Sequence, residues 1–477
     1  MNRFFPLLFL ALFVFSLQAC SQQHDSDPWT KLDSIRALIV APTFANKAYL
    51  ITDYGAKGDG VFMNTAIIND LITRCSENGG GKVVVPKGVF LSGAIHLKSN
   101  VNLHFEDGSK IIFSRNPQDY LPMVRSRWEG MDLMNYSPLI YAYQVENIAI
   151  TGNGILDGNA DNAHWWPWKA KKEYGWVDGM DSQLASVKQL TQQVKDRVPV
   201  EQRIYGEGGF LRPPFIQPYQ SKNIVIADVT INNAPFWNLN PVLCENVIVR
   251  DVKIITHGPN NDGCDPEASK NVLITGCYFD TGDDCIAIKS GRNEDGRDVA
   301  VPAENIIIEN CIMKDGHGGI VIGSEISGGA KNIFAQNLQM DSPELDRVIR
   351  LKTSSLRGGT IDGLYVRNIK VGTYKEAAIR FNMFYENPGD HLPQIKNVWI
   401  ENLQVEKGGK FGVLIDAYKE SPITNFTVIN SSINGVDVPI QSNYTENVVF
   451  SNFKINGKII ESIESANNNK KEKSEKF

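Results

Sequence analysis

Acidic and basic residues recur at regular intervals between residues 260 and 352. The four phrases are Asn260-Asn261-Asp262-Gly263, Gly282-Asp283-Asp284, Gly316-His317-Gly318 and Arg350-Leu351-Lys352. Cleavage of a glycosidic bond in an anionic sugar chain needs one carboxyl group to protonate the leaving oxygen and another to activate water. Three carboxylates, one imidazole and two fixed cations therefore predict an enzyme, provided that the fold brings them together.

A repeating phrase indicates the fold that could do so. A polar residue, then Asn, then an apolar residue recurs along most of the chain, with Gly363 in the Asn position once. The Asn residues are Asn147, Asn223, Asn246, Asn271, Asn305, Asn332, Asn397, Asn425 and Asn447. Each unit holds short runs of alternating apolar residues broken by turn residues, which predicts strands. A period in the twenties to thirties predicts a solenoid. We expect an all-β fold, a single-stranded right-handed parallel β-helix with coils stacked about 4.8 Å apart.

The register of the repeats can be tested on the polar residues. Asp283 lies 12 residues after Asn271, and His317 lies 12 residues after Asn305. If the apolar residues that follow stack in register, Asp283 and His317 lie directly above one another.

The flanking coils fit the same register. Asp262 aligns with Asp284, because the apolar residues two positions after each stack inward. Arg350 and Lys352 alternate with inward-facing neighbours and so point outward together. All six groups are then predicted on one face of about four coils, roughly 15 Å in length.

Crowding of three carboxylates should raise at least one pKa and leave a protonated acid beside ionised partners. His317 would hold and tune Asp283, and Arg350 and Lys352 match a substrate carboxylate. A calcium cage of Asp and Asn oxygens is one alternative, and ordinary turn chemistry is another. Four motifs in register favour catalysis over both.

These motifs resemble those of family 28 glycoside hydrolases, the polygalacturonases. The order Asn-x-Asp, Gly-Asp-Asp, Gly-His-Gly and Arg-x-Lys is complete here, and the resemblance covers residues 49–457. It implies a right-handed β-helix and hydrolysis of galacturonan with inversion at the anomeric carbon, without a metal or other cofactor. One departure is Asn261, in a position where the family often has Thr.

The resemblance also implies roles for individual residues. Asp283 would be the general acid, Asp262 and Asp284 would activate the water, and His317 would support the acid. The substrate-binding residues would be Asn260, Arg350, Lys352 and, on a looser alignment, Tyr385.

A long insertion at residues 159–214 interrupts the repeats. It contains Trp165-Trp166-Pro167-Trp168 and a helix-like run near residues 182–198. We expect it to close the non-reducing end of the cleft and make the enzyme exo-acting, with Arg203, Arg212 or the tryptophans near the terminal sugar.

Three alternatives remain open from the sequence. The nearest is a hydrolase of the same family acting on branched pectin, such as xylogalacturonan, rhamnogalacturonan or rhamnogalacturonan II. The others are a calcium-dependent pectate lyase and a non-catalytic carbohydrate-binding β-helix. The net charge of −6 argues against a nucleic-acid partner.

The first residues predict export. Arg3 precedes an apolar run from Phe4 to Leu17, too short to span a bilayer. Leu17-Gln18-Ala19-Cys20 resembles a bacterial lipobox, which implies cleavage after residue 19 and a lipid on Cys20. The alternative is an ordinary signal peptide. Ser21 favours an outer-membrane lipoprotein, displayed at the periplasmic face or the cell surface.

The rest of the chain is divided accordingly. We predict a tether over residues 20–46, a catalytic β-helix over 47–460 with a capping helix near 65–78, and a disordered tail over 461–477. The protein is expected to be a monomer. Six further cysteines are expected to fill the interior, although one disulfide remains possible: Cys75, Cys244, Cys264, Cys277, Cys285 and Cys311.

Overall fold

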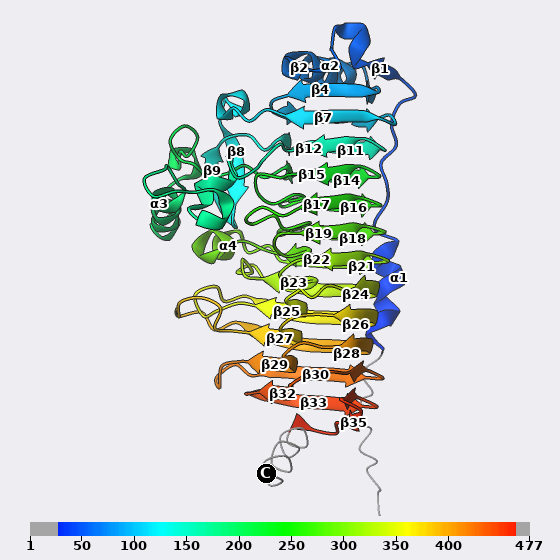
Figure 1. Ribbon diagram of the computed structural model, residues 1–477, viewed down its shortest axis with the longest axis vertical. Helices are drawn as coiled ribbons and strands as arrows, with labels where there is room; N and C mark the ends of the chain where they lie inside the picture. The colour runs from blue at the N-terminus through cyan, green and yellow to red at the C-terminus, as the bar shows by residue number, and fades with distance from the viewer. Residues whose placement is uncertain (1–26, 464–477) are drawn as a thin grey trace, which may run out of the picture.

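A computed structural model describes residues 27–463. The chain folds into the predicted right-handed parallel β-helix. The coils stack along the long axis, from the N-terminal coil at the top of Figure 1 to the C-terminal coil at the bottom. Each coil contributes strands to three parallel ladders, which form the three faces of the solenoid.

From residue 146 onward, each strand of the first ladder contains the repeated Asn, or Gly363 in its place. Its strands are β1 (Ala48–Leu50), β3 (Gly81–Val85), β6 (Val101–Phe105), β11 (Glu146–Gly152), β14 (Lys222–Ala227), β16 (Glu245–Arg250), β18 (Lys270–Thr275), β21 (Ala303–Glu309), β24 (Ala330–Met340), β26 (Thr360–Thr373), β28 (Gln394–Lys407), β30 (Ile423–Ile429) and β33 (Thr445–Ser451). The long strands β24, β26 and β28 continue around the bend into the second ladder.

The second ladder runs beside the first. Its other strands are β2 (Asp59–Met63), β4 (Gly88–Ser92), β7 (Ser109–Phe113), β12 (Ile155–Asp157), β15 (Thr230–Asn232), β17 (Lys253–Thr256), β19 (Tyr278–Thr281), β22 (Ile312–Asp315), β31 (Ser432–Ile433) and β34 (Lys454–Ile455), which pairs antiparallel with β35 (Lys458–Ile459).

The third ladder carries the site. Its strands are β5 (Ile95–His96), β10 (Ile140–Tyr143), β13 (Ile216–Tyr219), β20 (Ile286–Ile288), β23 (Ile320–Gly323), β25 (Arg347–Lys352), β27 (Ala377–Asn382), β29 (Phe411–Asp416) and β32 (Val438–Ser442). Single bridges through Leu239 and Cys264 connect β13 to β20.

Stacked asparagines fix the register of the coils. The Asn305 amide donates to the Asn271 side-chain oxygen at 3.0 Å, and Asn332 donates to Asn305 at the same distance. Asn271 and Asn305 have φ near +57° and Asn332 has +55°. Asn and Gly tolerate this left-handed region best, which explains Gly363 at φ +92° in the same position.

The interior is filled by aligned apolar side chains. Val272, Ile306, Ile333 and Leu364 stack one above another in the first ladder, each fully buried. The six predicted interior cysteines, within the described part of the chain, are all buried and free.

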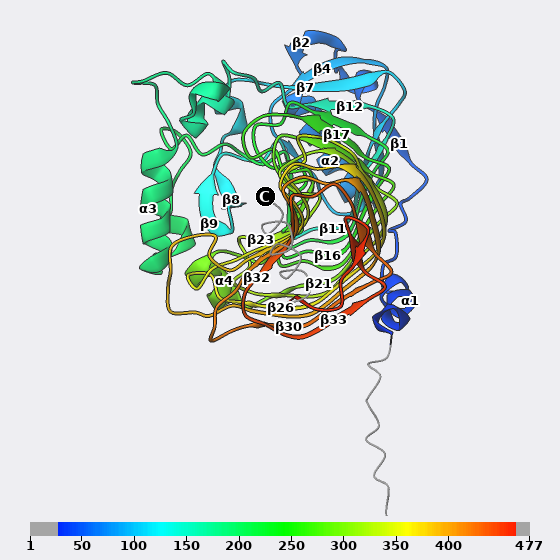
Figure 2. The same ribbon diagram turned by 60° about the horizontal axis from the view of Figure 1, so that its bottom comes forward.

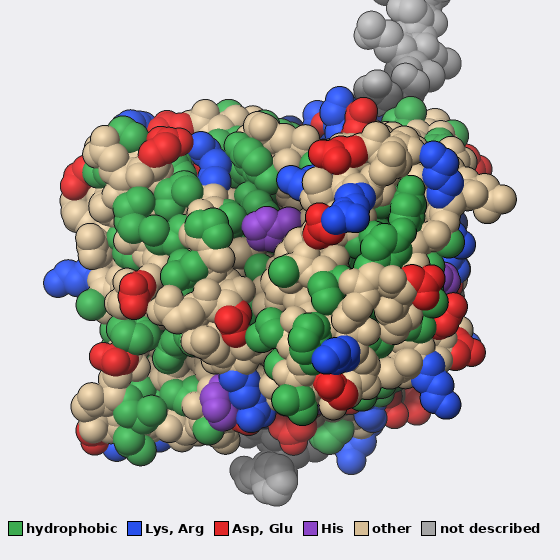
Figure 3. Space-filling model, turned by 90° about the horizontal axis from the view of Figure 1, so that it is seen from above, with side chains coloured by type: hydrophobic (Ala, Val, Ile, Leu, Met, Phe, Trp, Pro, Cys, Tyr) green, Lys and Arg blue, Asp and Glu red, His purple; other side chains and the backbone are tan. Residues whose placement is uncertain are grey.

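The N-terminal end is capped by α2 (Thr65–Glu77), at the top of Figure 1, as predicted. Its buried face, including Ile68, Leu71 and Ile72, covers the apolar opening of the first coil. Seen from this end, Figure 3 shows acidic and basic side chains interspersed on the surface, without a large area of one sign.

Part of the segment predicted as a tether, from residue 28 onward, packs against the solenoid. The segment η1 (Pro28–Lys31) and α1 (Leu32–Arg36) lies on the outer face of the first ladder. Trp29 contacts Phe334 edge to face at 5.6 Å, and the Arg36 guanidinium bonds both Glu309 oxygens at 2.7 and 2.8 Å. Cys20 with its lipobox and the tail after residue 463 lie outside the described residues.

A satellite of short elements packs on one side of the coils, at the left of Figure 1. It combines the predicted insertion with an antiparallel hairpin, β8 (Val124–Trp128) and β9 (Met131–Asn135), which the sequence did not indicate. The remaining elements are η4 (Trp166–Lys169), η5 (Lys172–Tyr174), α3 (Leu184–Lys195), η6 (Val200–Gln202) and α4 (Asn293–Val299), with η2 (Ile51–Tyr54) and η3 (Pro117–Tyr120) elsewhere. Across residues 27–463, no helix is both long and apolar enough to cross a membrane.

Candidate active site

A cleft of about 430 Å³ opens where the third ladder faces the satellite. It is lined by Glu129, Lys169, Trp237, Asn260, Asp262, Asp283, Lys289, Arg292, His317, Ser324, Glu325, Asp346, Arg347, Arg350, Lys352, Tyr385 and Glu386. Most of these residues come from the coils, while Glu129 comes from the β8–β9 turn and Lys169 from the insertion.

Asp283 and His317 stack as the repeat register predicts. The His317 Nδ1 and the Asp283 Oδ1 are 2.9 Å apart, and the His317 backbone N–H donates to the Asp283 carbonyl. Gly316 permits this approach, since a Cβ there would lie 2.6 Å from the same carbonyl oxygen. Burial opposes ionisation of Asp283, but the hydrogen bond and charge of His317 outweigh it and hold the pKa of Asp283 below its usual range.

Asp284 is fully buried beneath the cleft floor. It accepts hydrogen bonds from Lys352 Nζ at 2.6 Å and from Arg350 Nη1 at 3.3 Å. Both cations come from β25, where Ile349 and Leu351 point inward as predicted. Arg350 and Lys352 also line the cleft. The buried Asp284 carboxylate neutralises part of their positive charge.

Asp262 lies within reach of both other carboxylates. One oxygen each of Asp262, Asp283 and Asp284 lie within 4.8 Å of one another. Burial, reinforced by the charge of Asp283, raises the pKa of Asp262 to about 7. The predicted carboxyl group with a raised pKa is therefore present, but in the free protein it is Asp262 and not Asp283.

Lys289, which the sequence interpretation missed, sits beneath Asp262. Its ammonium lies 3.6 Å from Asp262, 3.5 Å from Asp265 and 3.2 Å from Glu325. It directly follows β20, where alternation after the inward Ile288 would have pointed it toward the cleft. Lys289 is thus the buried cation shared by three carboxyl groups, of which Asp265 has a pKa raised well above its usual range by burial and by the charge of Asp262.

The predicted substrate-binding residues Asn260 and Tyr385 both line the cleft. Asn260 Oδ1 accepts a hydrogen bond from Arg212 at 2.8 Å. The Tyr385 ring lies over both cations of β25, with its centroid 5.4 Å from the Arg350 guanidinium and 5.3 Å from the Lys352 ammonium. Tyr385 therefore lines the cleft beside Arg350 and Lys352, and its role in binding substrate stays a prediction.

The predicted sugar contacts from Arg203, Arg212 and the tryptophans are wrong, because none of these side chains lines the cleft. Arg203 is buried and pairs with Asp295 at 2.6 Å. Arg212 is fully buried and donates to the carbonyl oxygens of residues 235 and 259 at 3.0 and 2.6 Å. Arg212 thus connects the insertion to the coils, Arg203 connects elements within the satellite, and Lys169 is the insertion residue that lines the cleft.

Comparison with known proteins gives the family. The model of glycosyl hydrolases family 28 matches residues 206–457, more than half of the 477-residue chain. The chain belongs to this family.

Similar proteins agree with this placement. A hyperthermoactive exopolygalacturonase from Thermotoga maritima is 40% identical, with a TM-score of 0.89, over 91% of this chain and 97% of that chain. An exo-poly-alpha-D-galacturonosidase from Dickeya chrysanthemi is 28% identical over 90% of this chain and 75% of its own length. A probable polygalacturonase from Vitis vinifera is 26% identical over 82% and 74%. Membership in a hydrolase family disfavours the lyase and the non-catalytic alternatives.

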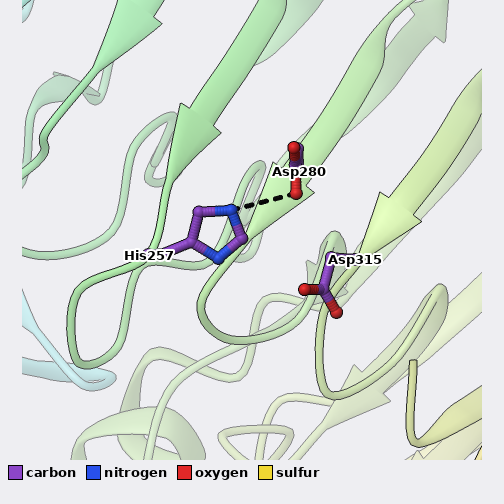
Figure 4. A group of neighbouring side chains, drawn as sticks. All are labelled: His257, Asp280 and Asp315. Atoms are coloured by element: carbon purple, nitrogen blue, oxygen red, sulfur yellow. Dashed lines mark ion pairs between the residues drawn. The ribbon is translucent and has the colours of Figure 1, made fainter. Parts of the chain in front are cut away.

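Within residues 27–463 of this family 28 hydrolase, two groups could offer ligands to a cation. In the group of Asp262, Asp283 and Asp284, the ammonium groups of Lys289 and Lys352 already contact the carboxylates, which favours acid/base chemistry over the calcium alternative. The second group, His257, Asp280 and Asp315, lies on the outside of consecutive coils (Figure 4). There His257 Nε2 pairs with Asp280 at 2.9 Å, and Asp280 stacks on Asp315 in the second ladder.

The His317–Asp283 contact predicts a pH-dependent contribution to stability. The hydrogen bond to Asp283 raises the pKa of His317 above 6.5, against a smaller opposing effect of burial. Since the raised pKa belongs to the folded state, the stabilisation is complete below pH 6.5 and is lost as pH rises through the folded value. The pKa of Asp283 is lowered, so its carboxylate remains charged across this window. Urea unfolding of wild type and His317→Gln should therefore show a stability gap that narrows with increasing pH, and a gap independent of pH would contradict the assignment.

Proposed function

We propose that the protein hydrolyses α-1,4-galacturonosidic bonds of pectin and releases galacturonate from the non-reducing end. The observation that carries the proposal is the cluster of Asp262, Asp283 and Asp284 within 4.8 Å, beside paired cations in a cleft with the satellite on one side. The names of the Thermotoga and Dickeya relatives support the exo mode.

In this mechanism Asp283 is the general acid, and Asp262 and Asp284 activate the water. In the free protein, burial and the charge of Asp283 raise the pKa of Asp262 to about 7, while the pKa of Asp283 is lowered. A bound galacturonate displaces water from Asp283 and adds a negative charge, and both effects raise its pKa. A proton moving from Asp262 to Asp283 would then leave an ionised base beside a protonated acid.

The remaining groups hold this arrangement. His317 keeps the Asp283 carboxyl in position through its Nδ1, and Lys352 and Arg350 hold the Asp284 carboxyl in place through charge-assisted bonds. The leaving-side sugar carboxylate would lie near Arg350 and Lys352, with Tyr385 against its ring.

Inversion at the anomeric carbon is also part of the proposal. Inverting glycosidases usually separate their two carboxyl groups by about 6.5–9.5 Å, and retaining ones by about 5–5.5 Å. The oxygens of Asp262, Asp283 and Asp284 approach within 4.8 Å, which is shorter than the inverting range. The family resemblance is the argument for inversion.

Product analysis on polygalacturonate tests the proposal. We expect monomeric galacturonate as the product from the first minutes, with little loss of viscosity, and the β-anomer as the first species in proton NMR. An early ladder of oligomers with a sharp fall in viscosity would contradict the exo mode, and an initial α-anomer would contradict inversion. Release from branched pectin alone would favour that alternative substrate.

We further propose that the protein is a monomeric outer-membrane lipoprotein attached through Cys20. The apolar run before Cys20 and the lipobox-like sequence support this. Expressed in a Gram-negative host, wild type should fractionate with membranes, and Cys20→Ser should appear in the soluble fraction. Equal amounts of both variants in the soluble fraction would contradict the anchor.

A further inference from the structure

Lys169 is the residue through which the insertion enters the cleft. It ends η4 and directly follows Trp168. Trp165 packs edge to face against Tyr120 at 5.4 Å and against Trp168 at 4.9 Å. The Gln183 backbone N–H donates to the Trp168 carbonyl oxygen at 2.8 Å. The position of Lys169 is therefore set by packing, while its side chain is half-buried at the cleft wall.

The other cations that line the cleft already have carboxylate partners. Lys289 pairs with Glu325, Arg292 with Glu129 at 2.8 Å, and Arg347 with Asp346 at 3.2 Å, while Arg350, Lys352 and His317 pair with the catalytic carboxylates. Within residues 27–463, Lys169 makes neither an ion pair nor a side-chain hydrogen bond. Among the described cations that line the cleft, Lys169 is therefore the one without a carboxylate partner, and the proposed substrate is an anion.

Lys169 lines the same cleft as Asp283. Burial lowers its pKa, and the nearby charges that act most on it are those of Glu129, Arg212 and Asp283. Arg350 also interacts with Asp283, but its other neighbours are Asp284, Tyr385 and Glu376. Asp283 therefore interacts with both Lys169 and Arg350, while the other charged neighbours of these two residues differ.

We propose that the Lys169 ammonium binds the carboxylate of the terminal galacturonate, the sugar that an exo-acting cut releases. The inference rests on the proposed function and adds a specificity determinant to it. Every unit of galacturonan carries a carboxylate, so the sugars on the two sides of the scissile bond need two cationic positions. The pair on β25 supplies the leaving side, and Lys169 supplies the other. A charge-assisted bond at a partly desolvated site selects the free acid over its methyl ester.

The test compares enzyme variants with substrate variants. Lys169→Met and wild type are assayed on digalacturonate and on digalacturonate methyl-esterified at the non-reducing sugar. A lost hydrogen bond to a charged group costs about 1.5–3 kcal/mol, so kcat/KM of Lys169→Met should fall about 10- to 150-fold on the free acid. On the terminal ester the same change should cost less than about threefold, and Lys169→Arg should recover part of the loss on the acid.

The insertion offers a matched control. Lys172 lies three residues further, is three-quarters exposed and pairs with Asp178 at 3.3 Å. Lys172→Met should behave as wild type on both substrates. Equal losses on acid and ester for Lys169→Met would show a structural role and overturn the proposal, as would no loss on either.

A binding measurement separates this inference from the proposed function. Calorimetry with monomeric galacturonate and its methyl ester needs no turnover. Wild type should prefer the acid, and Lys169→Met should lose that preference. If wild type cleaves neither digalacturonate yet shows the preference, the proposed function fails and the binding role of Lys169 stands. If wild type binds acid and ester equally, the role of Lys169 is overturned even where hydrolysis is observed.

Discussion

Asp283→Asn is expected to lower kcat on polygalacturonate by about 10³-fold, within the usual contribution of a general acid. The amide keeps the size of the side chain and its contact with His317 but has no proton to give to the leaving oxygen. Measurement of released reducing sugar at saturating substrate tests this value. Loss of less than about tenfold would contradict the role.

A substrate with an activated leaving group separates the acid from the base. The leaving group of 4-nitrophenyl α-galacturonide, 4-nitrophenolate, departs without protonation. Asp283→Asn should therefore retain most of the wild-type activity on this substrate. Asp262→Asn should lose activity on both substrates, because attack by water still needs a base. The reverse pattern would assign the acid to Asp262, the residue that holds the raised pKa in the free protein.

Lys289→Met is expected to destabilise the fold by about 3–5 kcal/mol at pH 7, since removing one partner leaves buried charges uncompensated. Lys289 is 2% exposed and lies within 3.6 Å of oxygens of Asp262, Asp265 and Glu325. Chemical denaturation followed by tryptophan fluorescence gives the value. Lys172→Met, an exposed substitution of the same kind, should change stability by less than about 0.5 kcal/mol.

The cost of Lys289→Met should depend on pH. Burial opposes ionisation of Glu325, but Lys289 and neighbouring arginines outweigh it and lower the pKa of Glu325. A lowered folded-state pKa gives stability that is present above 4.5, the ordinary value of Glu, and is lost as pH falls through the folded value. The difference between wild type and variant should therefore shrink in acid. A constant difference would mean that packing, and not charge, is what Lys289 supplies.

The repeat register made the coil-borne part of the site predictable. A spacing of 12 residues after the repeated Asn placed Asp283 and His317 together, and alternation placed Arg350 and Lys352 on one side of β25. In both cases the side chains follow a backbone whose period is fixed by stacked asparagines, so position along the chain converts to position in space.

The satellite could not be predicted in the same way, because it has no period. Arg203 and Arg212 were expected near the terminal sugar but are buried, and backbone carbonyl oxygens accept their hydrogen bonds. The β8–β9 hairpin lacked a tight-turn signature that would separate it from the preceding coils. Lys169 reaches the cleft only because the tryptophans before it pack inward, a tertiary contact that composition does not reveal.

The segment before β1 has a geometric consequence for a protein held at its N-terminus. Val40 exchanges two hydrogen bonds with the Asn246 side chain, and Trp29 is buried against the first ladder. The segment over residues 28–40, here called the strap, therefore packs along one side of the solenoid. In Figure 2 the strap and α3 lie on different sides of the coils. If the molecule is attached to a surface through residues before Asp27, the side of the solenoid that carries this segment would face that surface. The cleft would then open away from the surface, where it is accessible to the free end of a polymer.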